Sequence, residues 1–360
     1  MELATLLGLR PVAGAGLLVT LTRRCPLHCA HCSTTSTMDS EQLEADQLRR
    51  FIGSITPDTA PAVVFFTGGE PLLRPELLAE LAGLARRAGS ATAVLTGGFF
   101  ARGGAIPIHV GRGLVACDHI SFSLDAFHER EVARADVFAC LSQLLDHGKA
   151  VSLHVLGNGP DDPYLADVTA EVRRTFGAEV PMLVSEVRPV GRASSWLTGQ
   201  PAILDAGPRP CALAAWPVVA FDGTVLACCN QRLVDTRPVP AHLRLGQIGA
   251  DGWPTIRERL LGSPILRTIR TSGPLNLQAK LGIPDTCTGY CDSCRQLSDQ
   301  PGLAEYAARS AGGPTGALLD QQAGLLQQHA GAAALIRRYG SARYAELVDP
   351  AEVTPVGAEA

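Results

Sequence analysis

The chain has 360 residues, of which 46% are hydrophobic and 18% are charged, and its formal net charge is −4 at pH 7. This composition supports a large core with room for a smaller second unit, and the charge gives no sign of a nucleic-acid or membrane partner. The apolar first 22 residues carry Glu2 and Arg10 and lack a basic start, which is not typical of a signal peptide or membrane span. Because no signal sequence is evident and the eleven cysteines gather at ligand spacing, we expect a metal-binding, cytoplasmic protein.

Three cysteines follow directly after the first strand-like run, Gly16 to Thr22. They are Cys25, Cys29 and Cys32, in the sequence CPLHCAHC. This tight CxxxCxxC spacing can place three thiolates on one short loop around a single cluster. A [4Fe–4S] cube usually takes four thiolates, so one iron would stay open to coordinate something else. A zinc site is the alternative, because cysteine and histidine at short spacing also bind zinc.

Strand and helix patterns alternate from the first strand as far as residue 187. The predicted strands are Gly16–Thr22, Ala62–Phe66, Ala91–Thr96, His119–Leu124, Ala150–Leu156 and Val180–Val187. The predicted helices are a segment opened by Ser40 and Glu41, then Pro75–Ala88, Glu129–His147 and Asp162–Phe176, with an irregular stretch between the third and fourth strands. Six strands with intervening crossovers predict an α/β fold, either a parallel sheet or an incomplete (β/α)6 TIM-like barrel.

Glycine and polar residues follow three of these strands, in the sequences GGE, TGG and SLD. Parallel barrels place ligand sites at the carboxyl ends of their strands. Glycines there let the backbone approach a ligand closely, and a carboxylate can receive an ammonium group. As alternatives, Thr96 is a strand-end hydroxyl satisfied within the fold, and Asp125 caps a helix that begins near Glu129. The candidate ligand-binding residues are Gly68, Gly69, Glu70, Thr96, Ser123 and Asp125.

With CPLHCAHC followed by GGE one βα unit later, the chain resembles the radical S-adenosylmethionine (AdoMet) superfamily. The resemblance implies that the open iron chelates the amino and carboxylate groups of AdoMet. One electron from the cluster then cleaves AdoMet to a 5′-deoxyadenosyl radical. The residue before the third cysteine, commonly aromatic in the family, packs near the adenine and is His31 here. The family's GGE motif binds the methionine amino group, which assigns Glu70 to that role. Ribose hydroxyls and the methionyl carboxylate are implied partners of Thr96, Ser123 and Asp125.

Six further cysteines lie in the C-terminal part of the chain, whereas Cys117 and Cys140 fall at core-like positions. Two apolar runs flank Asp222-Gly223, which predicts a β-hairpin that brings the first of the six back toward the next two. If the second strand of this hairpin continues, Cys229 points away from Cys228. The six are Cys211, Cys228, Cys229, Cys287, Cys291 and Cys294.

The stretch that opens at Cys211, C-x11-G-x4-C, resembles the start of the SPASM/Twitch extension of radical AdoMet enzymes, whose cysteines hold auxiliary [4Fe–4S] clusters. The resemblance implies a shortened, Twitch-like region with one auxiliary cluster. A structural zinc ribbon is the alternative, and a second cluster with an open iron stays open as well. The implied ligands are Cys211, Cys228, Cys291 and Cys294, with Cys287 able to replace one of the last two.

The predicted organisation is a barrel at 12–195, a small cysteine-rich α+β region at 205–300, a helical segment at 301–349 and a flexible tail at 350–360. Between barrel and hairpin lies VSEVRPVGRASS. Similar segments leave the last barrel strand in the family, so Glu186, Arg188 and Arg192 either border the active site or form a solvated charge cluster.

The resemblance implies an enzyme whose AdoMet-derived radical abstracts hydrogen from an unactivated C–H bond. We expect an oxidoreductase that performs a net oxidation or cross-link in peptide natural-product maturation, with a flavodoxin- or ferredoxin-type electron donor. Dehydrogenation of a sugar or another small molecule is the alternative, favoured by the short sequence ahead of the first strand, which leaves no N-terminal peptide-recognition domain. An iron–sulfur or zinc binding module is the non-enzyme alternative.

Overall fold

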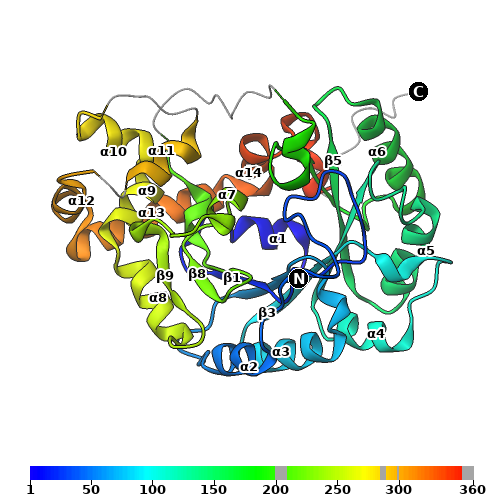
Figure 1. Ribbon diagram of the computed structural model, residues 1–360. Helices are drawn as coiled ribbons and strands as arrows, with labels where there is room; N and C mark the ends of the chain where they lie inside the picture. Colours follow the sequence, from blue (N-terminus) through cyan, green and yellow to red (C-terminus); the bar gives the residue numbers. More distant parts are fainter. Residues whose placement is uncertain (199–208, 284–288, 298–299, 351–360) are drawn as a thin grey trace.

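The computed structural model of the chain describes residues 1–198, 209–283, 289–297 and 300–350 (Figure 1). Cys287 and the predicted tail beyond residue 350 lie outside these residues. Within the described part of the chain, no helix is long and apolar enough to cross a membrane.

One nine-stranded sheet runs through the molecule in the order β6-β5-β4-β3-β2-β1-β7-β8-β9. Each neighbouring pair from β6 to β7 is parallel, whereas the β7–β8 and β8–β9 pairs are antiparallel. The strands are β1 (Gly16–Thr20), β2 (Val63–Thr67), β3 (Ala91–Thr96), β4 (His119–Asp125), β5 (Ala150–Gly157), β6 (Met182–Glu186), β7 (Val218–Val219), β8 (Thr224–Leu226) and β9 (Arg244–Gln247). The first six confirm the predicted incomplete (β/α)6 barrel, and their near-continuous apolar runs suit strands covered on both faces.

Helices cover the sheet on both faces (Figure 1). The crossover helices between β1 and β6 bury apolar faces against it, as Leu78 and Leu81 do on α3. On the other face, α1 and α14 form a second apolar cluster with Val63 and Ala93 of the sheet. The helices are α1 (Leu3–Gly8), α2 (Ala45–Gly53), α3 (Pro75–Arg87), α4 (Ile108–Val115), α5 (Arg134–Asp146), α6 (Pro163–Phe176), α7 (Gln231–Asp235), α8 (Trp253–Gly262), α9 (Pro264–Thr271), α10 (Pro274–Lys280), α11 (Tyr290–Gln296), α12 (Leu303–Ala311), α13 (Gly313–His329) and α14 (Gly331–Tyr339).

The predicted hairpin forms and extends the barrel sheet beyond β1. β7 pairs with β1, and the turn at Asp222-Gly223 leads into β8. The first residue of β1 is Gly16. A larger residue would not fit at this position, because a Cβ would lie 2.2 Å from the Trp216 ring. The C-terminal cysteine region is therefore built onto the same sheet as the barrel.

Two local predictions are wrong, and the helix α1 was not predicted. The stretch predicted as irregular contains α4, whose two glycines weaken the helical signal. One of them, Gly113, allows close packing, since a Cβ there would lie 3.1 Å from Leu72. The apolar N-terminus forms α1 before it reaches the first strand. The helix predicted from Glu129 begins only at Arg134, because the residues after β4 fold into a turn.

Candidate active site and C-terminal cysteine group

The segment that leaves β6 holds the cysteine loop that follows β1. Arg192 donates from Nε to the Cys29 carbonyl at 2.9 Å and from Nη1 to the Ser36 carbonyl at 2.7 Å. Its backbone N–H donates to the Cys32 carbonyl at 2.9 Å. Gly191 has a φ of 56°, and a Cβ there would lie 2.3 Å from that same carbonyl oxygen. Arg192 is therefore fixed against the cysteine loop and is not part of a solvated cluster.

The three thiols of this loop have different surroundings. Although burial opposes ionisation, hydrogen bonds from Thr34 and from backbone N–H groups, together with Arg192, hold the pKa of Cys32 below its ordinary value. His128 lies within hydrogen-bonding reach of Cys29. Burial raises the pKa of Cys25 to about 12, so a metal would have to displace its proton. Three mutually interacting thiols on one loop fit the ligand set of an iron–sulfur cluster.

Gly68 and Gly69 let the loop after β2 lie directly on the backbone that leads into the cysteine loop. A Cβ on Gly68 would lie 2.2 Å from the Thr22 carbonyl oxygen, and one on Gly69 would lie 2.4 Å from that of Arg24. The Gly69 N–H donates to the Thr22 carbonyl at 2.7 Å. In the described structure these glycines bring two loops together, so the GGE segment helps to set the position of Cys25.

The Glu70 carboxylate is completely buried. It accepts hydrogen bonds from the Thr96 hydroxyl at 2.9 Å to each oxygen, from the Gly97 N–H at 2.9 Å and from the Leu72 N–H at 3.0 Å. Burial raises the pKa of Glu70 to about 7 even though these donors favour the ionised form. A carboxylate offers about four lone-pair positions, so three donors leave room for an ammonium group. Thr96 is thus satisfied within the fold and also orients the candidate AdoMet carboxylate.

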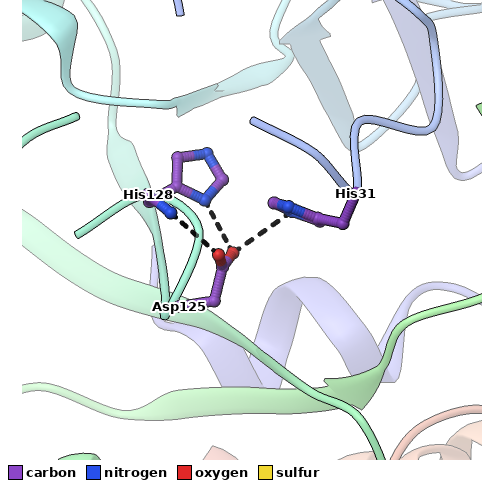
Figure 2. Close-up of side chains that lie close together, drawn as sticks. All are labelled: His31, Asp125 and His128. Carbon is purple, nitrogen blue, oxygen red and sulfur yellow. Dashed lines mark hydrogen bonds and ion pairs between the residues drawn. The ribbon is translucent and has the colours of Figure 1, made fainter. Parts of the chain in front are cut away.

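At the end of β4, the buried Asp125 gathers two histidines (Figure 2). Its Oδ2 accepts from His128 Nδ1 at 2.6 Å and lies 3.2 Å from His31 Nε2. Its Oδ1 accepts the backbone N–H groups of Phe127 and His128 at 2.9 and 3.0 Å. Against the effect of burial, the Asp125 carboxylate raises the pKa of His128 to about 10, and the histidines hold the pKa of Asp125 far below its ordinary value. Asp125 therefore caps a turn, and His128 is a cation.

The same three side chains have a spacing that would also suit a metal ion, with ligand atoms within 4.8 Å of one another. The 2.6 Å separation of Asp125 Oδ2 and His128 Nδ1 is, however, that of a strong charge-assisted hydrogen bond. We therefore describe His31, Asp125 and His128 as a hydrogen-bonded network beside the cysteine loop.

Aromatic rings lie over this network. His31 stacks on Phe127 with 4.8 Å between ring centroids, and Phe127 meets Trp196 at 5.5 Å. The Trp196 indole donates to the Ala30 carbonyl at 3.0 Å, which joins the segment after β6 to the cysteine loop. The role of His31 beside an adenine stays a prediction, but its ring belongs to a surface suited to stacking.

Ser123 lies two residues before Asp125, on the same face of β4, and pairs in register with His154 on β5. Burial lowers the pKa of His154 to about 4, so this ring is neutral at pH 7. Sequence reasoning did not select His128 or His154. The first has a signal in SLDAFHE, three residues after the aspartate, whereas the second sits inside an apolar strand.

The C-terminal cysteines form a second group. Because β8 runs antiparallel to β7, Cys228 returns toward the end of the hairpin where Cys211 precedes β7. Cys228 is close enough to Cys211 and Cys294 for charge on either to raise its pKa, and Cys291 is similarly close to Cys211. Burial raises the pKa of all four thiols, that of Cys291 to about 11. Such thiols suit a metal centre that displaces their protons.

Cys229 also lies near this group, and the prediction that it points away from Cys228 does not apply. That prediction required the strand to continue, but β8 ends at Leu226, so strand alternation does not reach residues 228 and 229. Cys229 is close enough to Cys211, Cys228 and Cys291 to influence their ionisation.

An unclosed parallel barrel whose strand ends carry a three-cysteine loop and a buried carboxylate defines the class of AdoMet-dependent iron–sulfur proteins. In agreement with this, residues 19–171 match the family model of the Radical SAM superfamily. Residues 19–171 thus correspond to a radical SAM domain, whose family uses a [4Fe–4S] cluster and AdoMet, and the predicted resemblance to this superfamily is confirmed.

Related proteins cover parts of the chain. It is 40% identical over 88 residues to the PqqA peptide cyclase of Streptomyces rochei, which is 24% of each protein. It is 27% identical over 173 residues to the PqqA peptide cyclase of Methylobacterium sp. (strain 4-46), 44% of each. The chain therefore spans less than half the length of these curated relatives. In fold it is similar to Streptococcus suis SuiB bound to S-adenosylmethionine, with a TM-score of 0.50 and 11% identity over 68% of this chain and 65% of that one.

Proposed function

We propose that the protein is a radical SAM enzyme that oxidises or cross-links a peptide, with one auxiliary [4Fe–4S] cluster held by C-terminal cysteines. The observation that carries this proposal is the second thiol group, which three separate segments build beside the radical SAM domain. Its members are Cys211, Cys228, Cys229, Cys291 and Cys294. The similarity to PqqA peptide cyclases supports a peptide as the substrate.

When bound, the N-terminal cluster supplies the electron that cleaves AdoMet to a 5′-deoxyadenosyl radical, and an auxiliary cluster supplies an acceptor for the electron that a net oxidation removes. Cys25, Cys29 and Cys32 would hold the first cluster. Arg192 favours the thiolate of Cys32, and His128 lies within hydrogen-bonding reach of Cys29.

The strand-end residues would bind AdoMet. Glu70 accepts the ammonium group, while Thr96 keeps the carboxylate in place. The ring surface of His31 and Phe127 suits an adenine. Ser123 offers an oxygen acceptor to a ribose hydroxyl, whereas the acceptor positions of Asp125 are already taken by the two histidines and two backbone N–H groups. Because Glu70 and Asp125 are buried, water is excluded from the place where so reactive a radical would form.

Separating AdoMet cleavage from product formation tests the proposal. Cys291→Ala with Cys294→Ala should still yield 5′-deoxyadenosine from AdoMet and dithionite, but no oxidised peptide. Precursor peptides encoded beside the gene serve as substrates, and mass spectrometry detects the loss of two hydrogens. Cys140→Ala, which removes a buried cysteine of α5, is the matched control and should form product.

Three results would contradict the proposal. Zinc at the C-terminal cysteines would exclude the auxiliary cluster. Normal product from the double variant would make that centre structural and favour redox-neutral chemistry. Oxidation of sugars, with every neighbouring peptide left unchanged, would replace the peptide substrate by a small molecule.

A further inference from the structure

Arg10 is buried beside the C-terminal cysteine group and makes an unusual contact. Its side chain lies in the segment between α1 and β1, and the residue is only 9% exposed. Nη2 donates to the sulfur of Cys229 at 2.9 Å. Nη1 is buried and has no hydrogen-bond partner within the described part of the chain. A guanidinium therefore reaches the thiol group with one amino group bonded to sulfur and the other unsatisfied.

Other contacts fix this position. The guanidinium lies 4.8 Å from the centroid of the Trp216 ring, a cation–π distance. The Trp216 indole in turn donates to the carbonyl of Leu9, the residue before Arg10, at 3.0 Å. In the sequence, Trp216 lies between Cys211 and β7. Its contacts with Leu9 and Arg10 therefore hold the N-terminal segment against the hairpin that carries the cysteines.

A buried guanidinium stays charged, so the fold must supply a negative partner. Arg270 shows the usual solution in this chain: it is buried and pairs with Asp320 at 2.6 and 2.8 Å. For Arg10, no carboxylate among the described residues lies within ion-pair distance, and the acceptor present is the Cys229 sulfur. Among the described residues, the buried Arg10 guanidinium is therefore directed at the thiol group and not at a carboxylate.

We propose that Arg10 is the buried counter-charge of the auxiliary centre and that Cys229 is the member of that centre through which Arg10 acts. This inference rests on the auxiliary cluster of the proposed function. An iron–sulfur cluster with thiolate ligands is anionic, and its potential depends on net charge and on hydrogen bonds to its sulfurs. Because reduction adds a negative charge, Arg10 raises the reduction potential of the cluster and makes it a better electron acceptor. It is a positioning residue, since it touches neither substrate nor AdoMet.

The test measures the potential of the C-terminal cluster alone. In the background Cys25→Ala, Cys29→Ala, Cys32→Ala, iron bound to the chain belongs to the C-terminal centre, and EPR-monitored redox titration gives its midpoint. Arg10→Gln should lower the equilibrium constant for one-electron reduction at least tenfold, which is about 59 mV. Arg10→Lys keeps the charge, and its midpoint potential should lie between those of the triple-alanine background and of Arg10→Gln. The control is Arg134→Gln. Arg134 also stacks on an aromatic ring, that of Tyr164, but it pairs with carboxylates. The midpoint potential of the cluster should not change in this variant.

Each outcome is decisive. Absence of iron in the triple-alanine background would overturn the auxiliary cluster and this inference with it. A cluster present with the same midpoint in Arg10→Gln would overturn the inference alone. If neither Arg10 variant folds, Cys229→Ala decides: a changed EPR spectrum of the reduced cluster places Cys229 in the centre, and an unchanged spectrum excludes it.

Discussion

Replacing Thr96 by valine removes the hydroxyl that donates to both oxygens of the Glu70 carboxylate, while keeping nearly the same side-chain shape. Both residues are buried, so water does not replace the lost donor. Hydrogen bonds to charged groups contribute about 1.5–3 kcal/mol. Since one pKa unit corresponds to about 1.36 kcal/mol, losing this donor should raise the pKa of Glu70 by roughly one to two units.

The sign of the effect on AdoMet binding follows from the charge that the ammonium group needs. Burial holds the pKa of Glu70 near 7, so the carboxyl is neutral below that pH and cannot form the ion pair. Affinity should therefore rise as the pH increases through 7, by about tenfold between pH 6 and pH 8. In Thr96→Val the rise should move to about pH 8–9, so that affinity at pH 7.5 falls roughly 3- to 25-fold.

Calorimetric titration of AdoMet into the cluster-loaded protein from pH 6 to pH 9 measures this shift. The control is Thr92→Val, because Thr92 lies on the same strand, is buried, and donates to a different carboxylate, Asp118, at 3.0 Å. Its binding curve should keep its midpoint near pH 7. A Thr96→Val protein with the parental midpoint and affinity would refute the role given to the Glu70 carboxylate.

Three further predictions concern the cluster loops. Anaerobically reconstituted protein should hold about eight irons, as two cubes, and the Cys25→Ala, Cys29→Ala, Cys32→Ala variant about half of them by iron assay; a parental content near twelve would reveal a further cluster. Glu70→Gln should bind AdoMet roughly ten- to a hundredfold more weakly with full iron content, and unchanged affinity would contradict the ion pair. Gly191→Ala should lose N-terminal iron, because its Cβ would overlap the Cys32 carbonyl at 2.3 Å in a left-handed backbone, whereas Gly148→Ala, also left-handed but with nothing within 4 Å, should keep it.

The barrel was predictable because its strands are buried on both faces. Runs such as those of β2 and β3 consist of apolar residues and threonine, and their ends fall within about two residues of the predicted ones. Elements without such an apolar run were missed. α4 combines two glycines with β-branched residues, and its stability comes from packing on α3, which no local pattern encodes. The late start of α5 was also missed, because the Asp125 carboxylate closes a turn with the N–H groups of Phe127 and His128 and the chain enters the helix only at Arg134.

The candidate site also has one part that the local sequence predicts and another part that it does not. Spacing alone identifies Cys25, Cys29 and Cys32, because ligands on one short loop are neighbours by sequence. Contacts between distant segments leave no such mark. Arg192 reaches the cysteine loop across 163 positions to the Cys29 carbonyl, and Arg10 reaches Cys229 across 219. Cys229 was set aside on an alternation rule that fails where β8 stops, and this end is set by tertiary structure.

The segment from Arg188 to Arg192 links the two thiol groups, which gives them a common structural support. Arg192 is bonded to the first cysteine loop, while the charge of Arg188 acts on Cys291 and its side chain donates to the Tyr339 carbonyl at 3.0 Å. The Tyr339 hydroxyl accepts the N–H of Ala212, next to Cys211, at 3.1 Å. Four residues of backbone span at most about 14 Å. A change in this segment should therefore alter the support of both thiol groups at once.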